Sequence, residues 1–489
     1  MLYAAAAPPE TPRTGGLLAI VGGTGGLLTV AVLGIALLLL LIIKVRLQPF
    51  VALLAVSVAV GLSAGIPVTE LFGTVQKSAA VPMIESGMGG ILGHVAIIIG
   101  LGTMLGSILE VSGGAEVLSR RLLDLFGERR APVAMGLTGL VLGIPVFFDV
   151  GVLVLAPIVY AAAKRSGKSV LLYAMPLLAG LSMTHAFLPP HPGPVAAAGL
   201  FDVPLGWVVV MGAVCGLPAV LAAWVYANWI GGRVFVPVPR DMAEAAEEAR
   251  AAVAAEQRAA GGTRSEAPVS LATVLVIIGT PLLLILAATF SSVMFAPSAP
   301  RSVVEFFGNP FVALTIALLM AYCLLGIRRG WSRRSLERVS ASSLKPVGNI
   351  LLVVGAGGVF GAVLKGSGIA GALADAFDGM GLPVIVLAYL ISLVLRVAQG
   401  SATVAIVATA GITVPLVEGA GHSRAFLALV ITAISAGSIF ASHVNDGGFW
   451  IVAKYFGIPE RDTLRSWTVL ESVLSVTGFA VAAALSTVV

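Results

Sequence analysis

Polar and ionisable side chains interrupt the apolar sequence at a few places, and these are the candidates for chemistry. Asp149 follows Phe147 and Phe148 at a Gly/Pro break in a long apolar run. No cationic side chain is near it in sequence, so its carboxyl group is suited to binding and releasing a proton. The alternative is that Asp149 caps the helix that follows, because Asp is a favoured N-cap residue.

Residues 182–194 combine hydroxyl groups, two histidines and a run of prolines. Four prolines fall between positions 189 and 194, and they end any helix there because proline lacks an N–H and clashes with the preceding turn. Thr184, His185 and His191 can donate hydrogen bonds to an anion, and the histidines can also exchange protons. Two alternatives stay open: a structural pair of hydrogen-bonded histidines, and a zinc site, for which no third ligand stands at a recognised spacing.

A third group lies at residues 396–403. Arg396 supplies a permanent cation, Gln399, Ser401 and Thr403 supply hydrogen-bonding groups, and Gly400 lets a ligand approach the backbone. A helix starting here would direct its free N–H groups and the positive end of its dipole at a bound anion. The alternative for Arg396 is that its long side chain snorkels to the membrane interface.

The fourth group, residues 442–450, contains the amide of Asn445 and the carboxylate of Asp446, whose alternative role is helix capping in a turn. Together the four groups suit a small hydroxylated organic anion that moves with protons. Neither a cofactor nor a metal is expected. The predicted substrate contacts are His185, Thr184, Arg396, Gln399, Gly400, Ser401, Thr403 and Asn445, and the predicted proton-coupling residues are Asp149, His191 and Asp446.

Composition identifies the setting of these groups. Of 489 residues, 58% are hydrophobic and 11% are charged, against roughly 25% charged in soluble domains. The net charge of +5 arises from basic runs beside apolar segments, which is typical of cytoplasmic membrane loops and not of a nucleic-acid surface. Cys215 and Cys323 lie in apolar runs without CxxC spacing, so we expect packing residues and no disulfide framework. The sequence predicts an all-α polytopic membrane protein.

Two apolar segments, 132–163 and 383–416, are too long for one transmembrane helix and too short for two with a loop. Each breaks at its middle, so we predict two re-entrant helical hairpins beside about ten full spans. The other apolar segments are 24–43, 50–66, 89–110, 169–188, 203–230, 271–290, 306–327, 346–364, 424–443 and 466–489.

The two halves of the chain also resemble each other. Residues 99–106 match 354–361 at an offset of 255, and the distribution of basic loops gives the two copies opposite orientations, with both termini outside the cytoplasm. The alternative is chance similarity between glycine-rich helices. We therefore predict four parts, namely N-terminal spans with a connector (1–88), repeat 1 (89–230), a cytoplasmic linker with two spans (231–345) and repeat 2 (346–489).

Three of these motifs, at residues 143–151, 185–194 and 442–450, together resemble the gluconate permease (GntP) family of bacterial proton symporters. The resemblance runs from about residue 24 to the C-terminus, and the Ala/Pro-rich residues before it depart from the family pattern. It implies a multi-pass importer of the bacterial inner membrane for gluconate or a related sugar acid, coupled to protons. Other hydroxy acids and D-serine are carried within the same family. The fold implied is that of the ion-transporter superfamily, with an elevator-like movement.

The predicted function is therefore secondary active symport, with the hairpin tips and broken helices meeting around the substrate near the middle of the membrane. The expected partners are a small organic anion, protons and the lipid bilayer, with a homodimer as one possible assembly and no nucleic acid. A membrane enzyme using His185 and Asp149 is an alternative from a different class, although an active site rarely needs two opposed copies of a scaffold. A channel is the third alternative.

Overall fold

The computed structural model describes residues 23–73, 81–238, 269–345, 347–369, 371–372, 383–418 and 420–489. Throughout these ranges the chain is helical or irregular, and no strand occurs in them. Within the same ranges, eight helical segments are long and apolar enough to cross a membrane, and four shorter apolar helices have 10–17 residues. The all-α polytopic prediction is confirmed, whereas the division into ten full spans and two hairpins stays a prediction. Most of the predicted polar linker lies outside the described residues.

The first long apolar segment is broken where the sequence predicts. Helix α6 (Ala131–Gly143) ends before Pro145, and α7 (Phe148–Ser166) begins three residues after that proline. The second segment divides into α18 (Val384–Gln399) and α19 (Ala402–Val417). Gly400 between them has a φ of +83°, a left-handed conformation that glycine adopts without strain, and Ser401 caps α19 by accepting from the N–H of Val404. Both breaks are confirmed; their re-entry into the membrane from one side stays a prediction.

Two further helices are interrupted in corresponding places. Helix α8 (Leu171–Phe187) gives way to the proline-rich segment and then to α9 (Pro192–Leu200). Helix α20 (Arg424–Gly437) gives way to an irregular stretch and then to α21 (Gly447–Tyr455), which is capped by the side chain of Asp446. The segment between α8 and α9 is buried apart from Pro190, which is half-buried, whereas Val444 and Asn445 between α20 and α21 are exposed.

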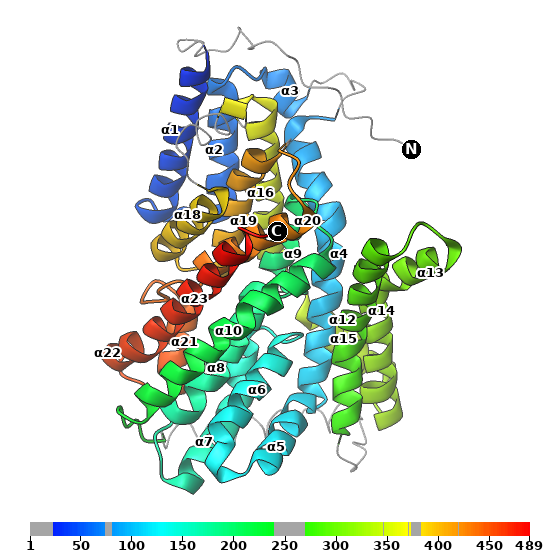
Figure 1. Ribbon diagram of the computed structural model, residues 1–489, viewed down its shortest axis with the longest axis vertical. Helices are drawn as coiled ribbons and strands as arrows, with labels where there is room; N and C mark the ends of the chain where they lie inside the picture. Colours follow the sequence, from blue (N-terminus) through cyan, green and yellow to red (C-terminus); the bar gives the residue numbers. More distant parts are fainter. Residues whose placement is uncertain are drawn as a thin grey trace.

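The packing of these elements is duplicated between the halves of the chain (Figure 1). Helix α6 packs on α8, and α18 packs on α20; α8 packs on α10 (Leu205–Gly231), and α20 packs on α23 (Val469–Leu485). Helices α10 and α23 pack against each other. Contacts also cross between the halves, because α7 touches α21 and α19 touches α9. The second helix of each broken segment therefore contacts the interrupted helix of the other half.

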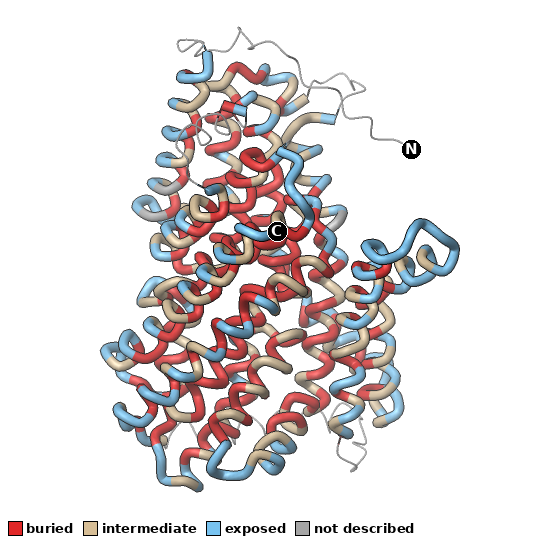
Figure 2. The backbone as a smooth tube through the Cα atoms, viewed as in Figure 1, coloured by how far each residue is buried: buried red, intermediate tan, exposed pale blue. Residues whose placement is uncertain are grey.

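The remaining helices surround this body. Helices α1 and α2 pack together beside α16, α4 runs along α16, and α12 to α14 form a group at one side (Figure 1). Buried residues run through the interior of the body, whereas α13 is largely exposed (Figure 2). The bounds are α1 Thr24–Ile43, α2 Pro49–Ser63, α3 Val68–Phe72, α4 Met83–Val111, α5 Gly114–Phe126, α12 Leu271–Met294, α13 Ala299–Gly308, α14 Pro310–Ala321, α15 Arg333–Ser343, α16 Val347–Gly366 and α22 Glu460–Thr463.

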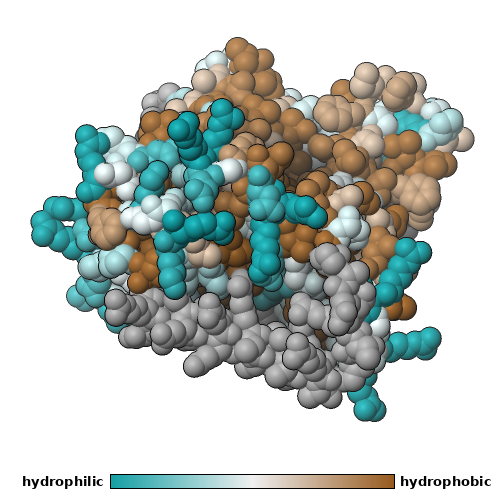
Figure 3. Space-filling model, turned by 90° about the horizontal axis from the view of Figure 1, so that it is seen from below, coloured by the Kyte–Doolittle hydropathy of each residue, from teal (hydrophilic) through white to brown (hydrophobic). Residues whose placement is uncertain are grey.

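Hydrophilic side chains gather on the lower end of the molecule, seen in Figure 3, which is the end where α5 and α7 lie in Figure 1. Basic residues follow or end these helices: Arg129 and Arg130 come directly after α5, and Lys164 and Arg165 lie in the last turn of α7. Cations at this end agree with the predicted cytoplasmic side.

The two cysteines differ in their surroundings. Cys215 is fully buried in α10, as predicted for a packing residue. Cys323 is exposed in the π-helical turn Tyr322–Gly326, so the prediction of a packing role is wrong for this residue. An apolar sequence does not say which side of a helix faces its neighbours.

Backbone contact between α6 and α8 depends on glycine. A Cβ atom added at Gly139 would lie 2.1 Å from the carbonyl oxygen of Leu177, and one at Gly180 would lie 2.5 Å from the N atom of Leu140. Small residues of this kind let helices in membranes approach until their backbones touch. The first half of the broken segment is thereby fixed to α8.

We expect Gly139→Ala to lower the free energy of unfolding by roughly 1–3 kcal/mol, because the added methyl group forces the two backbones apart. Thermal unfolding of the purified protein in detergent measures the change. Gly90→Ala on α4 is the matched control, since a Cβ there meets nothing within 4 Å. Equal stability of both variants would contradict backbone contact as the reason for Gly139.

Candidate functional site

The breaks converge on one cavity of about 400 Å³. Its walls come from the start of α7, from α8, from α16, from the α18–α19 break, from the loop before α21 and from the start of α23. Nine of the predicted site residues line it, and they are Asp149, His185, Arg396, Gln399, Gly400, Ser401, Thr403, Asn445 and Asp446. Residues more than 250 positions apart in the chain are thus brought to one site.

Thr184 and His191 do not line this cavity. Thr184 is buried, and its hydroxyl donates to the carbonyls of Gly180 and Leu181 at 3.0 and 3.1 Å. His191 is also buried; its Nε2 lies 2.5 Å from the carbonyl oxygen of Gly143, and its ring lies 4.8 Å from that of His185. Thr184 therefore bonds within α8, whereas His191 contacts the last residue of α6.

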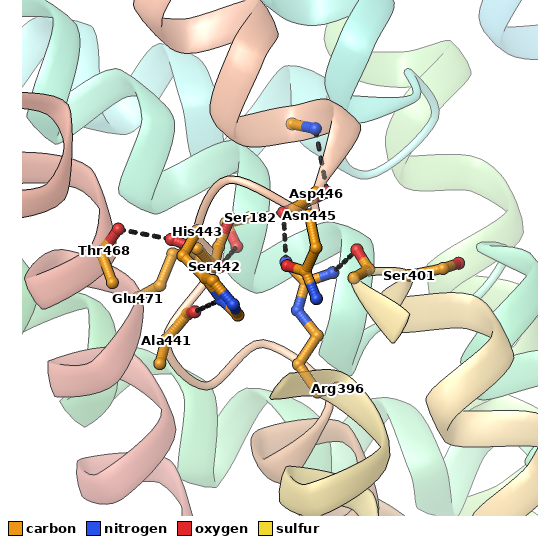
Figure 4. A network of polar contacts seen from close by, with 12 residues as sticks. Ser182, Arg396, Ser401, Ala441, Ser442, His443, Asn445, Asp446, Thr468 and Glu471 are labelled. Atoms are coloured by element: carbon orange, nitrogen blue, oxygen red, sulfur yellow. Dashed lines mark hydrogen bonds and ion pairs between the residues drawn. The ribbon is translucent and has the colours of Figure 1, made fainter. Parts of the chain in front are cut away.

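Arg396 forms the central ion pair of the site. Its Nη2 donates to Oδ2 of Asp446, and its Nη1 donates to the carbonyl oxygen of Gly400 (Figure 4). The side chains of Arg396 and Asp446 are only 5% and 12% exposed. The guanidinium therefore lies inside the protein, and the alternative that Arg396 snorkels to the interface is wrong. The Nε atom of Arg396 is buried and has no partner among the described residues.

Asp446 is held by donors on both of its carboxylate oxygens. Oδ2 accepts from Arg396 and from the Ser442 hydroxyl, while Oδ1 accepts from the backbone N–H of Gly448 at 2.9 Å. Ser442 in turn accepts from the indole N–H of Trp467 at 2.7 Å. These contacts carry out the capping role that was the alternative for this motif, and they also make Asp446 the counter-ion of Arg396.

The loop before α21 fits directly against the α18–α19 break. A Cβ atom at Gly400 would lie 2.2 Å from the carbonyl oxygen of Asn445, so only glycine is accommodated there. The Asn445 amide donates to the carbonyl of Val397 at 2.8 Å, at the open end of α18. The two interrupted elements of the second half thus form one assembled wall of the cavity.

Asp149 lies in the first turn of α7 and is exposed to the cavity. The N-cap position is occupied by Phe147, and no side chain caps the helix, so the capping alternative for Asp149 is wrong. A carboxylate in the first turn of a helix is still favoured by the helix dipole.

Sequence reasoning missed two polar residues of the wall, Glu471 and Asn349. Glu471 of α23 is 1% exposed and accepts from the Ser182 hydroxyl at 2.9 Å, a contact that joins the two halves of the chain (Figure 4). Asn349 of α16 lines the opposite side, where it accepts from the amide of Gln48 at 2.7 Å. A signal for Glu471 was available, because it is the single acidic residue in the apolar segment 466–489.

A polytopic helical body with a polar cavity formed by interrupted helices defines a multi-pass membrane transporter. The chain belongs to the GntP permease family, whose model matches residues 26–488. It is 43% identical over 93% of its length to the inner membrane permease YgbN of Escherichia coli K12, of which the match covers 97%. It is 36% identical over 94% of its length to the gluconate permease of Bacillus subtilis 168, with 100% of that protein covered. The predicted family is thereby confirmed, as are inner-membrane localisation and a transporter in place of an enzyme.

Two solved transporters share the fold at low sequence identity. The chain superimposes on Neisseria gonorrhoeae MtrF with a TM-score of 0.56 at 17% identity, covering 93% of this chain and 96% of that one. The match to the Alcanivorax borkumensis YdaH transporter has a TM-score of 0.56 at 14% identity, covering 90% and 96%. These similarities establish the transporter fold of the chain.

We expect Asp446→Asn to lower the free energy of unfolding by about 3–5 kcal/mol, because it leaves a buried guanidinium without its counter-ion. Asn still caps helices well, so the variant isolates the charge. Thermal unfolding in detergent measures the effect. Asp202→Asn is the control: its partner Arg424 is exposed, the atoms are 3.6 Å apart, and an exposed pair contributes less than about 1 kcal/mol. Similar losses in both variants would refute the role assigned to the buried pair.

Proposed function

We propose that this protein imports gluconate or a related sugar acid into the cell by symport with protons. The observation that carries the proposal is the composition of the cavity: the guanidinium of Arg396 stands beside the amides and hydroxyls of Gln399, Ser401, Thr403 and Asn445. Such a set recognises a molecule that has one anionic end and several hydroxyl groups. Relatives named gluconate permeases or gluconate transporters, at 34–37% identity, support the same substrate.

The cavity suits a sugar acid in size and polarity. Its volume of about 400 Å³ falls at the lower end of the usual range of small-molecule sites, roughly 300–1,000 Å³. The N-terminus of α19 begins at the cavity wall, where its unpaired N–H groups favour a carboxylate. The hydroxyl groups of the substrate would then face the amides of Gln399 and Asn445.

The charges of the cavity give a physical reason for proton coupling. Arg396 is already neutralised by Asp446, and Asp149 and Glu471 contribute two further carboxyl groups. An anionic substrate therefore enters a site whose cation is already paired, and its negative charge is costly there unless a proton enters with it. Asp149, His191 and Asp446 are the groups that the sequence predicts for this role.

The duplicated packing of the two halves supports two inverted repeats with re-entrant hairpins. Each half supplies one broken segment and one interrupted helix, and the second helices of the broken segments cross to the opposite half. We propose that this assembly carries the cavity across the membrane in an elevator-like movement.

A second candidate substrate is another small hydroxy acid. The relative YgbN is named only as a permease, and its 43% identity exceeds the 36% of the Bacillus subtilis gluconate permease. The same cavity chemistry serves any short hydroxylated carboxylate. Competition by a panel of such acids against labelled gluconate separates the two candidates.

Purified protein in liposomes should accumulate labelled gluconate when an inward proton gradient is imposed, and a protonophore should abolish the accumulation. Arg396→Gln should reduce uptake per folded protein roughly tenfold to a hundredfold, because a charge-assisted hydrogen bond contributes about 1.5–3 kcal/mol. Uptake that a protonophore leaves unchanged would refute the coupling.

Arg333→Gln is the control for the arginine, since Arg333 is an exposed residue at the start of α15, away from the cavity. The amount of folded protein is determined by size-exclusion chromatography for each variant. Equal uptake by the two variants would count against Arg396 as the anion-binding residue.

A further inference from the structure

Glu471 is a buried carboxyl group in the wall of the cavity. It lies on α23, is 1% exposed, and its Oε2 accepts a hydrogen bond of 2.9 Å from the Ser182 hydroxyl of α8. Its other oxygen, Oε1, is buried and has no hydrogen-bond partner within the described chain. Among the described residues, the neutral Ser182 hydroxyl is the single hydrogen-bond donor to this carboxyl group.

Comparison with Asp446 shows what Glu471 lacks. The Asp446 carboxylate has a guanidinium, a hydroxyl and a backbone N–H as donors, whereas none of the ion pairs among the described residues includes Glu471. Burying an ionised carboxylate with so few donors is expensive, and addition of a proton removes that cost. A proton on Oε1 also converts the unpartnered atom into a hydrogen-bond donor at the cavity wall.

The charged and titratable groups around Glu471 are few. Asp149 of α7, His185 of α8, Arg396 of α18 and Asp446 line the same cavity, and Arg396 and Asp446 act on Glu471 with opposite sign. Beyond the cavity, Tyr389 of α18 is bonded to Ser475 one turn further along α23, and α10 carries Cys215 and Tyr226. The Arg396–Asp446 pair is neutral as a unit, so it supplies no net positive charge to hold Glu471 ionised.

We propose that Glu471 is the proton-carrying residue of this transporter and that Ser182 positions its carboxyl group. The inference rests on the proposed symport and identifies the group that performs it. On the outer side, an O–H bond of a hydronium ion breaks and leaves a water molecule, and the proton forms a new O–H bond at Oε1 of the carboxylate. On the inner side this bond breaks, the proton returns to water, and no electrons are transferred.

This assignment explains how one proton accompanies one anion. With Glu471 neutral, the substrate carboxylate meets the Arg396–Asp446 pair without a further buried negative charge. Once the proton has left, the Glu471 carboxylate and the substrate share a cavity of about 400 Å³ and repel each other, which favours release of the substrate. Asp149 is less suited to the role because it lies in the first turn of α7, where the helix dipole favours its ionised form.

The test separates exchange from net transport in liposomes that contain the purified full-length protein. Counterflow, the exchange of labelled for unlabelled gluconate, requires substrate movement but no proton gradient. Accumulation driven by an imposed pH gradient requires that substrate movement be coupled to proton movement. Glu471→Gln keeps an acceptor for Ser182 and cannot titrate, so counterflow should persist and gradient-driven accumulation should be lost. Glu110→Gln on α4 is the matched control, because Glu110 is half-buried in an apolar helix outside the cavity; both activities should persist.

The outcomes distinguish failure of the proposed symport from failure of the role assigned to Glu471. If the unmodified protein shows counterflow without gradient-driven accumulation, symport itself fails and the inference falls with it. If the unmodified protein is coupled and Glu471→Gln still accumulates gluconate, symport stands and Glu471 is not the proton carrier. Loss of both activities in a Glu471→Gln protein that elutes as folded material would make Glu471 a substrate-binding or structural residue and overturn the inference.

A second variant covers the case in which Glu471→Gln does not fold. Ser182→Ala removes the one hydrogen bond that the described residues donate to the Glu471 carboxylate, so the proton should leave only at higher pH. The pH profile of gradient-driven uptake should shift to the alkaline side. An unchanged profile in folded Ser182→Ala protein would overturn the positioning role of Ser182 and the assignment of the proton to Glu471.

Discussion

The ion pair between Arg396 and Asp446 is the contact on which the cavity depends. A guanidinium inside an apolar helical body is tolerated only with a counter-ion and further acceptors, and here Asp446 and the carbonyl of Gly400 supply them. The pair joins the α18–α19 break to the loop before α21, and Ser442 extends the connection to Trp467 in the π-helical turn that precedes α23. Three segments that are each irregular on their own are thereby held in one arrangement.

The same ion pair determines the electrostatics of the site. Because Arg396 is neutralised within the protein, the cavity can attract a carboxylate without holding it as tightly as an unpaired buried cation would. Substrate specificity then depends on Asn445 and on the amides and hydroxyls of the α18–α19 break, which can form hydrogen bonds with hydroxyl groups of the substrate. This division of roles suits a carrier, which must release its substrate as readily as it binds it.

The sequence predicts the broken helices correctly because clusters of proline, glycine and polar residues within an apolar run end a helix at or near their own positions. Gly400, with its left-handed φ of +83°, follows the end of α18, and Pro145 follows the end of α6. Contacts between residues that are far apart in the chain cannot be read from the sequence around either residue. Arg396 and Asp446 are 50 positions apart, and Ser182 and Glu471 are 289 apart, so their contacts follow only from the packing of α8, α18 and α23. Thr184 and His191 have suitable chemistry but face the α6 end, because helix rotation is set by neighbours that the sequence does not specify.

The glycines that match between the two halves have a common physical role, which argues against chance similarity. In the first half, a Cβ at Gly102 would lie 2.9 Å from Pro190, and one at Gly106 would lie 2.0 Å from the carbonyl oxygen of Pro145. Their counterparts at the offset of 255, Gly357 and Gly361, face Val407 and Gly411 of α19 at 2.5 and 3.7 Å. In both halves the repeated glycines therefore bring a long helix, α4 or α16, against an interrupted element. Small residues at such contacts let the backbones of two helices approach closely, so the repeated glycines place each interrupted element against its long helix in the same way.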